Sequence, residues 1–354
     1  MSAGANPDVL VRVEGLVKHF PVKTGALFGG SGEVVHAVDG VDLEIRRGET
    51  LGLVGETGCG KSTLARCIIR LLEPTSGRVV FDGQDIAGAS ARELRTFRSR
   101  AQLVFQDPYG SLNPRRRVGS IIGDPFEIHG VAKGGDRVER VKALMRVVGL
   151  NPEHYNRFPA EFSGGQRQRI GIARAIALQP CLVVCDEPVS ALDVSIRAQI
   201  LNLLGDLQAE FGLTYLFISH DLSVVEHVSD RVAVMYLGKI VEVAPAADLY
   251  AHPRHPYTAA LLSAVPVADP DVADRHQRTI LTGDPPSPLD PPRACRFHPR
   301  CPKAQPVCAE REPALEPRLG DGPEHTAACH FPVADGELLP TAPALAGEPW
   351  PSRP

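Results

Sequence analysis

The feature that most constrains this chain is a glycine-rich loop that directly follows a short apolar run. The run covers residues 51–54, and the next nine residues read Gly-Glu-Thr-Gly-Cys-Gly-Lys-Ser-Thr. The pattern G-x-x-x-x-G-K-[ST] between a strand and a helix is typical of a phosphate-binding loop. The glycines let backbone N–H groups surround phosphate oxygens, and the N-terminus of the following helix adds partial positive charge. A glycine-rich turn with an incidental lysine would not account for both spacing and context.

The residues of this loop have separate expected roles. Lys61 would reach the β- and γ-phosphates of a nucleotide, and the Ser62 hydroxyl would bind Mg²⁺. Cys59 stands at a variable position of the pattern, where we expect a small spacer. The predicted nucleotide site comprises Gly55, Glu56, Thr57, Gly58, Cys59, Gly60, Lys61, Ser62 and Thr63.

A second apolar run, residues 182–185, ends in two adjacent acids, Asp186 and Glu187. In a parallel sheet, ligands collect at the carboxyl ends of the strands, so Asp186 should emerge beside the phosphate loop. We expect Asp186 to belong to the Mg²⁺ shell and Glu187 to polarise the attacking water as a general base. A solvated Asp-Glu turn is the alternative, and the phosphate loop argues against it.

Two further polar residues follow apolar runs. His220 comes shortly after residues 215–218, and Gln106 follows residues 102–105. His220 would lie at a strand end within reach of the γ-phosphate. Considered singly, however, His220 would be a structural cap and Gln106 an ordinary turn residue.

The first 250 residues alternate β-rich runs with helical patterns, which predicts an α/β domain. We expect strands at 9–13, 34–38, 43–45, 51–54, 78–81, 102–105, 182–185, 215–218, 232–236 and 239–243. We expect helices at 61–72, 91–98, 166–178, 196–210 and 222–228. Between residues 113 and 162 the strand signal disappears and amphipathic helix dominates, as at 137–148. This pattern predicts a helical insertion within the α/β core.

Composition and charge exclude several classes of protein. Hydrophobic residues make up 43% and charged residues 23% of the 354 positions, which excludes a wholly disordered or fibrous chain. The formal net charge of −4 argues against a nucleic-acid partner. No stretch reaches the roughly 18–20 apolar residues that span a bilayer, and the N-terminus does not resemble a signal peptide. We therefore expect a cytosolic protein with reduced thiols.

The composition changes near residue 265. Of the 32 prolines, 19 lie from residue 266 onward, together with Cys295, Cys301, Cys308 and Cys329. Four reduced cysteines within 35 residues suit a four-thiolate metal site. By spacing alone, zinc and an iron–sulfur cluster fit equally, and four unliganded thiols remain the alternative. His298 and His330 could each replace a cysteine, but we expect neither to do so.

One further motif identifies a family. Residues 162–169, Phe-Ser-Gly-Gly-Gln-Arg-Gln-Arg, resemble the signature motif of ATP-binding cassette (ABC) ATPases, with Ser163 placed 23 residues before Asp186. The phosphate loop, Gln106, this motif, Asp186-Glu187, the Ser-Ala-Leu-Asp of 190–193 and His220 follow the family's order over residues 8–265. The resemblance implies an α/β ABC-type P-loop ATPase core with an antiparallel β subdomain and a helical subdomain over about 107–165.

The resemblance also implies roles that spacing alone does not. Ser163, Gly165 and Gln166 would contact the γ-phosphate of ATP held by an opposite cassette, so that two cassettes enclose two nucleotides. Gln106 would bind Mg²⁺ and couple the site to a membrane partner. Asp193 would belong to the loop that communicates across the dimer, and His220 would be the switch histidine.

An aromatic residue upstream of the phosphate loop normally stacks on adenine in this family. Phe20 fits that role, although residues 23–34 form a longer insertion than most cassettes have. The alternative is that Phe20 is a core residue at a strand end.

Three segments resemble the di- and oligopeptide importer cassettes: residues 105–115, 255–262 and 283–288. The segment 295–302, Cys-Arg-Phe-His-Pro-Arg-Cys-Pro, resembles the tail of those importers, which implies a four-iron four-sulfur cluster on the four tail cysteines. In such importers the segment after Gln106 receives a helix of the membrane subunit. Residues 115–117, Arg-Arg-Arg, would face that subunit or form a solvated turn.

The expected domains are the ABC core (8–265), a cysteine module (266–331) and a flexible tail (332–354). The expected protein is an ATP-hydrolysing subunit of a peptide importer, peripheral to the cytoplasmic face of the cell membrane. Its expected partners are a second, related cassette subunit, two membrane permeases and an external peptide-binding protein. Importers of nickel or glutathione remain alternatives, as does a soluble cassette ATPase of translation or DNA repair, and the chain by itself leaves the solute open.

Overall fold

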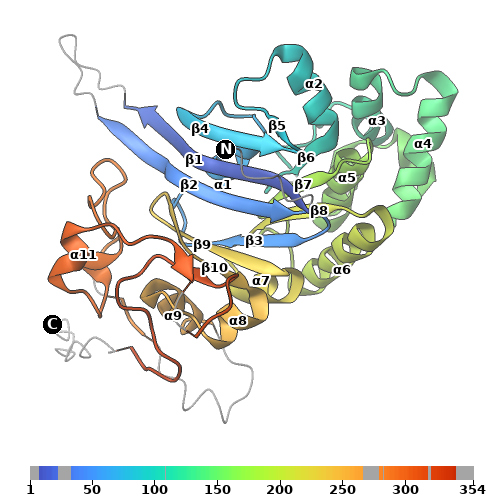
Figure 1. Cartoon of the computed structure of the whole chain (residues 1–354). Coiled ribbons are helices and arrows are strands. Elements are labelled where there is room, and N and C mark those ends of the chain that lie inside the picture. The colour runs from blue at the N-terminus through green and yellow to red at the C-terminus, as the bar shows by residue number, and fades with distance from the viewer. Residues whose placement is uncertain are drawn as a thin grey trace, which may run out of the picture.

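The computed structural model of this chain describes residues 8–22, 33–107, 109–265, 279–281, 283–317 and 320–339. Two sheets form its framework, a four-stranded sheet with the order β2-β1-β4-β5 and an eight-stranded sheet with the order β11-β12-β10-β9-β3-β8-β7-β6. Figure 1 shows the smaller sheet above the larger one, with most of the helices below the larger sheet and at one side of it. The predicted α/β fold class, including its antiparallel and helical subdomains, is confirmed.

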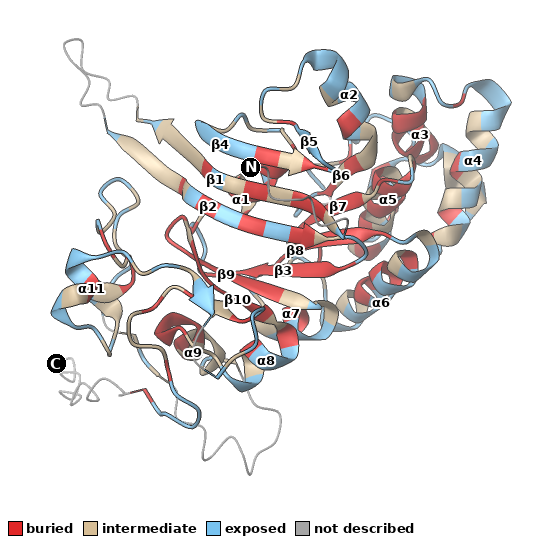
Figure 2. Cartoon of the chain, in the orientation of Figure 1, coloured by how far each residue is buried: buried red, intermediate tan, exposed pale blue. Residues whose placement is uncertain are grey.

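The centre of the larger sheet is parallel. Strand β3 (Thr50–Val54) pairs in parallel with β8 (Thr214–Ile218) and β9 (Arg231–Tyr236), β8 pairs with β7 (Leu182–Asp186), and β7 pairs with β6 (Ala101–Val104). Every residue of β3, β7 and β8 is buried (Figure 2), because both faces of these strands are covered. Continuous apolar runs in the sequence therefore marked the strands that carry the site.

Successive residues of these strands enter two different cores. Leu53, Val184 and Leu216 pack with α1 (Lys61–Ile68) beneath the smaller sheet. Val54 and Cys185 pack on the other face with α6 (Val194–Phe211) and α7 (Leu222–Val228). This period of two is what a strand covered on both faces requires.

The smaller sheet contains longer strands than predicted. Strand β1 (Val9–Pro21) continues well past the predicted end at 13, and β2 (Val34–Arg46) joins the predicted runs 34–38 and 43–45. The β1–β2 ladder passes Gly15 and Gly40 through register shifts, with positive φ at both glycines. Each glycine interrupts the β-rich pattern of the sequence, and the paired strands accommodate both as bulges. Strands β4 (Ser76–Phe81) and β5 (Gln84–Asp85) complete this sheet.

The helical insertion lies at one end of the larger sheet. It contains α3 (Val118–His129), α4 (Gly134–Val147) and two short 3₁₀ turns, η1 (Pro152–Asn156) and η2 (Pro159–Glu161), and it leads into α5 (Gly164–Ile176). Helix α2 (Ala91–Arg100) precedes β6. Among the predicted helices, 61–72 is too long, because α1 ends at Ile68 and Arg70 adopts a left-handed conformation (φ 54°).

The C-terminal region extends the larger sheet at its opposite edge (Figure 1). After β10 (Lys239–Pro245), α8 (Ala246–Ala251) and α9 (Pro256–Leu262), the chain forms η3 (His298–Arg300), α11 (Pro306–Glu310), β11 (Glu316–Pro317) and β12 (Thr326–Ala327). Strand β12 pairs antiparallel with β10, and β11 with β12. The predicted cysteine module is therefore joined to the ATPase core by a shared sheet.

The prediction of a flexible tail over residues 332–354 is wrong for the first part of that segment, residues 332–339. The Val333 N–H donates to the Arg254 carbonyl at 2.8 Å, and the Lys303 ammonium lies 2.7 Å from the Glu337 carboxylate. Val333 and Leu339 are buried. Apolar burial and ion pairs hold this segment on the core, and residues 340–354 lie outside the described residues.

None of the helices that the structure describes is both long enough and apolar enough to span a membrane.

Candidate nucleotide site

The phosphate loop connects the end of β3 to the start of α1, as predicted. Gly55, Gly58 and Gly60 have φ values of 149°, 83° and 110°. A Cβ on Gly55 would lie 2.1 Å from the Met235 carbonyl oxygen, and one on Gly60 would lie 2.0 Å from the Ala37 carbonyl oxygen. Both the conformation and the close backbone approach therefore require glycine at positions 55 and 60.

Lys61 folds back over this loop. Its Nζ donates to the carbonyl oxygens of Gly55 at 2.7 Å and Glu56 at 3.0 Å, and the side chain is buried. These two bonds satisfy a buried ammonium group and keep its charge inside the loop. The arrangement provides a cation where phosphates would enter.

A hydroxyl and a carboxylate meet at the far end of the loop. The Ser62 hydroxyl donates to Asp186 Oδ1 at 2.7 Å, and Arg66 lies 3.5 Å from Asp186 Oδ2. Asp186 ends β7 and is buried. A hydroxyl and a carboxylate at this spacing are the oxygen ligands that Mg²⁺ accepts beside a nucleotide. The structure thus brings together Ser62 and Asp186, two of the three residues expected at the Mg²⁺ site, while the third, Gln106, bonds to Glu187.

Glu187 lies at the centre of a second group of polar side chains. Gln106 Nε2 donates to Glu187 Oε2 at 2.9 Å, and His220 Nδ1 lies 3.2 Å from Glu187 Oε1. The three residues come from the ends of β6, β7 and β8, so neighbouring strands deliver them to one edge. Glu187 has a left-handed backbone (φ 49°), and its N–H donates to the Ile218 carbonyl at 3.0 Å. Such a conformation in a residue other than glycine is strained and often occurs at functional positions.

The signature segment forms the start of α5. Ser163 caps this helix by accepting from the Gln166 N–H at 3.3 Å, while the Ser163 N–H donates to Gln166 Oε1 at 3.0 Å. Gly165 allows a close approach of α6, since a Cβ there would lie 2.4 Å from Ile196. Ser163 and Gln166 are exposed, and no hydrogen bond or ion pair within the described part of the chain joins them to the phosphate loop. Asp193 is exposed at the N-terminus of α6.

Phe20 lies near the end of β1, opposite Val35 of β2. Its ring is partly exposed, belongs to neither core cluster, and has the Lys18 ammonium 5.0 Å from its centroid. Phe20 therefore lies outside the two buried cores and is accessible for stacking. Stacking on adenine stays a prediction.

The three arginines at 115–117 are exposed, as expected for a surface turn. Arg116 makes a bidentate pair with Asp124, with both N–O distances 2.6 Å, and Arg117 donates to the Asn156 side chain at 3.0 Å. Two of the three are thus already partnered within the helical insertion.

The four tail cysteines come together in the C-terminal module. The Cys295 N–H donates to the Cys308 carbonyl at 3.0 Å, and the Cys301 thiol interacts electrostatically with Cys329, Cys295 and Cys308. Burial raises the pKa of Cys301 to about 12, so its unliganded thiol would be protonated at neutral pH. None of the eight cysteines, all of which are described, forms a disulfide.

Zinc and an iron–sulfur cluster both take cysteine thiolates as ligands. Zinc bound tetrahedrally at about 2.3 Å holds its sulfurs about 3.8 Å apart. Within the part of the chain that the structure describes, no three cysteine sulfurs lie within 4.8 Å of one another. Cys295 also lines a cavity of about 500 Å³ between the module, β2 and β10. The module thus provides four cysteine thiols, two buried and two half-buried, as donors of the kind that both a zinc ion and an iron–sulfur cluster take.

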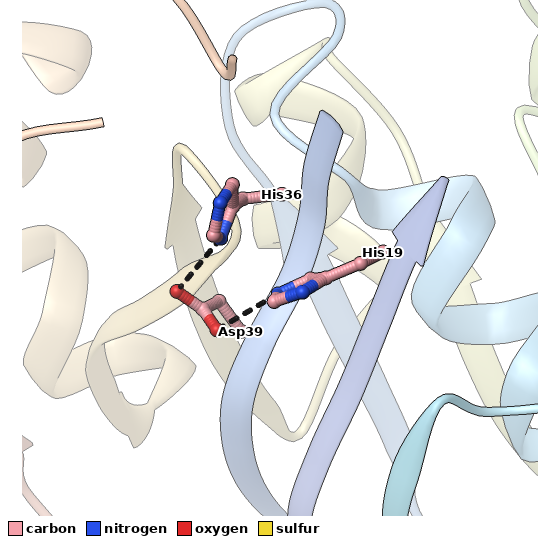
Figure 3. Close-up of side chains that lie close together, drawn as sticks. All are labelled: His19, His36 and Asp39. Carbon is pink, nitrogen blue, oxygen red and sulfur yellow. Dashed lines mark hydrogen bonds and ion pairs between the residues drawn. The ribbon is translucent and has the colours of Figure 1, made fainter. Parts of the chain in front are cut away.

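The smaller sheet carries a cluster of three polar side chains that the sequence patterns did not indicate: His19, His36 and Asp39 (Figure 3). His19 Nε2 lies 3.1 Å from Asp39 Oδ1, and His36 Nδ1 lies 3.5 Å from Asp39 Oδ2. The two histidines lie opposite each other on β1 and β2, a register that no local pattern predicts. Arg296 of the C-terminal module pairs with Asp39 Oδ2. Since a guanidinium already neutralises this carboxylate, the cluster has no need of a metal ion.

The chain is similar to known ATP-binding proteins of ABC transporters. Residues 38–190 match the family model described as ABC transporter, and residues 241–308 match the one described as oligopeptide/dipeptide transporter, C-terminal region. The oligopeptide transport ATP-binding protein AppF of Bacillus subtilis (strain 168) is 52% identical over 92% of this chain and 98% of its own length. The probable peptide ABC transporter ATP-binding protein y4tS of Sinorhizobium fredii is 53% identical over 95% and 94%, respectively.

A solved structure shares the same core. The dimeric post-hydrolysis state of the ATP-binding cassette MJ0796, bound to ADP and Pi, matches with a TM-score of 0.59 and 28% identity, over 67% of this chain and 98% of that one. The fold and the site together define an ATPase of the ATP-binding cassette class. The chain belongs to the ATP-binding proteins of the oligopeptide and dipeptide ABC transporter family.

Proposed function

We propose that this chain hydrolyses ATP to drive the import of di- or oligopeptides across the cytoplasmic membrane. The observation that carries the proposal is the meeting of Ser62, Asp186 and Glu187 at one edge of the parallel sheet, next to the phosphate loop. Family membership and the peptide-transport names of the relatives support the solute class. Nickel and glutathione are the alternative solutes.

The roles of the site residues follow from their chemistry. Lys61 and the loop N–H groups would hold the β- and γ-phosphates, and Glu187 would accept a proton from the attacking water. Ser62, Asp186 and Gln106 would hold Mg²⁺, which neutralises charge on the phosphates when bound. His220 would contact the γ-phosphate, and Phe20 would stack on adenine. In the structure, Gln106 and His220 both contact Glu187, which orients the carboxylate before nucleotide arrives.

A second cassette would complete the site. Among the described residues, neither Ser163 nor Gln166 bonds to this chain's own phosphate loop, and both are exposed, as residues that serve a partner's nucleotide must be. The dimer reported for the MJ0796 cassette supports pairing. We propose a related but different cassette as partner, together with two membrane permeases and an external peptide-binding protein. The assembly would place the chain at the cytoplasmic face of the membrane.

For the C-terminal module, we propose that Cys295, Cys301, Cys308 and Cys329 hold a four-iron four-sulfur cluster. The electrostatic contact of Cys301 with the other three thiols, the burial of Cys308 and Cys329, and the cavity beside Cys295 support this assignment. When bound, such a cluster supplies redox chemistry or a rigid crosslink, and no step of ATP hydrolysis requires it. Zinc is the alternative.

The decisive experiment is reconstitution. The chain would be co-expressed with permeases encoded beside it, purified as a complex and placed in proteoliposomes with a di- or oligopeptide, Ni²⁺ or glutathione. ATP-dependent uptake of peptide supports the proposal, whereas uptake of Ni²⁺ or glutathione alone would replace the solute class. A free ATPase that ignores permeases and is stimulated by nucleic acid would instead identify a soluble cassette enzyme.

A further inference from the structure

The C-terminal module contacts the phosphate loop directly through one ion pair. Arg300 Nη1 lies 3.1 Å from both carboxylate oxygens of Glu56, the second residue of the loop. The Arg300 side chain is 9% exposed and that of Glu56 29%. The two residues are 244 positions apart in the chain. The Coulomb attraction within an ion pair so shielded from water is stronger than within an exposed surface pair.

Glu56 is held at its backbone by the same neighbourhood. Its N–H donates to the Tyr257 hydroxyl at 2.9 Å, and Arg300 Nη1 donates to the Tyr236 hydroxyl at 3.4 Å. The rings of Tyr236, Tyr257 and Phe297 pack together, with centroid distances between 4.7 and 5.4 Å. Groups from β9, α9 and the C-terminal module therefore fix both the main chain and the side chain of one loop residue.

The position of Glu56 gives this contact an electrostatic consequence. Its carbonyl oxygen accepts from Lys61 Nζ, so the residue lies inside the loop that would receive phosphate. A carboxylate left unpaired there would repel the negatively charged phosphates. Arg300 offsets that charge and keeps the carboxylate turned toward the module.

A second arginine of the same short segment anchors it. Arg296 is buried, donates to the Leu237 carbonyl and pairs with Asp39, which also contacts His19 and His36 (Figure 3). Between the two arginines, the Arg300 N–H donates to the Phe297 carbonyl at 3.0 Å. This anchored turn delivers the Arg300 guanidinium to the loop in one orientation.

We propose that Arg300 is a positioning residue of the ATP site, which acts through Glu56 to set the affinity of the phosphate loop for nucleotide. The proposal rests on ATP binding at this loop. Because Arg300 immediately precedes Cys301, it also puts the cysteine module in direct contact with the ATPase motor. The C-terminal module thereby contributes to the nucleotide site.

A double-mutant cycle on the full-length chain tests this. Titration with a fluorescent ATP analogue, with and without Mg²⁺, gives the Kd of wild type, Arg300→Gln, Arg300→Lys, Glu56→Gln and the Arg300→Gln/Glu56→Gln double variant. We expect Arg300→Gln to weaken binding about fivefold, with kcat at saturating ATP changed by less than about twofold. Arg300→Lys should retain part of the affinity, because lysine keeps the positive charge but lacks the planar guanidinium group with its several N–H donors.

The double variant separates charge from structure. Arg300→Gln weakens nucleotide binding because it leaves the Glu56 carboxylate unpaired. Removing that carboxylate as well should therefore restore most of the affinity, so the effects of the two substitutions on the Kd are strongly non-additive. The matched control is Lys303→Gln, which removes another cation of the module, one that pairs with Glu337 and makes no loop contact. It should leave the Kd unchanged.

Three outcomes would overturn the proposal: an unchanged Kd in Arg300→Gln, additive effects in the double variant, or an equal loss in Lys303→Gln. Lys61→Ala distinguishes these from failure of the site itself. If Lys61→Ala loses nucleotide while Arg300→Gln does not, only the role of Arg300 is wrong. If Lys61→Ala binds normally, the phosphate loop is not the nucleotide site.

Discussion

His220 Nδ1 lies 3.2 Å from Glu187 Oε1, and the opposite oxygen of Glu187 accepts from Gln106 at 2.9 Å. A carboxylate held at both oxygens by neighbouring strand ends has a defined direction before any substrate binds. Such preorganisation is what a general base for an attacking water needs.

Glu187→Gln keeps the size of the side chain and removes its ability to accept a proton. We expect ATP turnover to fall by roughly 10²- to 10⁴-fold, with ATP binding retained and closed, ATP-bound dimers accumulating. Single-turnover hydrolysis and size-exclusion chromatography with ATP measure the two effects. Glu210→Gln, on an exposed position of α6, is the control and should behave as wild type. Wild-type turnover in Glu187→Gln would rule out the general-base role.

Lys61→Ala removes the buried ammonium that bonds to the carbonyls of Gly55 and Glu56. We expect the Kd for ATP to rise by more than about tenfold, because the phosphates lose their only buried cation within the loop. Equilibrium binding measures this, and circular dichroism checks that the fold persists. Unchanged affinity would contradict the assignment of the loop.

Gly60→Ala places a Cβ 2.0 Å from the Ala37 carbonyl oxygen at a residue with φ 110°. We expect a loss of about 1–3 kcal/mol in the free energy of unfolding and a distorted phosphate loop. Gly88→Ala is the control, since Gly88 has no atom within 4 Å of an added Cβ. Denaturant unfolding of both variants measures the free energy of unfolding. Equal midpoints would contradict the prediction and show that the loop can rearrange to accept the Cβ.

The tail cysteines predict a metal content. Protein purified without oxygen should contain iron and acid-labile sulfide in equal amounts, and Cys301→Ser should lose both. Cys67→Ala, a buried core cysteine, should retain the iron while losing some stability. Zinc in place of iron would correct the cluster assignment, and absence of both metals would leave unliganded thiols.

Acid should weaken the docking of the C-terminal module. Burial raises the pKa of Asp39, but the charge of Arg296 and the hydrogen bond with His19 lower it more, so the net shift is downward. A carboxyl with a folded-state pKa below its unfolded value of about 4 stabilises the fold above that pH and loses the contribution as pH falls through the folded pKa.

Arg296→Gln removes the main partner in this pair. The free energy of unfolding should fall by about 1–3 kcal/mol at pH 7, because the buried Arg296 also donates to the Leu237 carbonyl. The part of this difference that comes from Asp39 should be lost below about pH 4. Urea titrations at both pH values measure it. A difference that grows in acid would reverse the assigned direction of the pKa shift.

Some features of the site depended only on local spacing. The strand–loop–helix order around Gly55 and Lys61, and the acids that end β7, are each set within a few residues, so pattern alone located them. The helix cap at Ser163 is equally local. Strand lengths in the smaller sheet were underestimated because pairing across β1 and β2 carries the strands through Gly15 and Gly40.

Short local patterns were enough to predict the class of chemistry, because phosphate loops and strand-end carboxylates are each encoded within a few residues. Three contacts, by contrast, are visible only in the folded chain. Glu187 lies between Gln106 and His220, Asp39 pairs with Arg296, and Arg300 forms an ion pair with Glu56. Each of these contacts joins residues far apart in the chain, and their proximity arises from strand order and from docking of the C-terminal module on the larger sheet. Contacts of that kind leave no periodic trace in a single sequence.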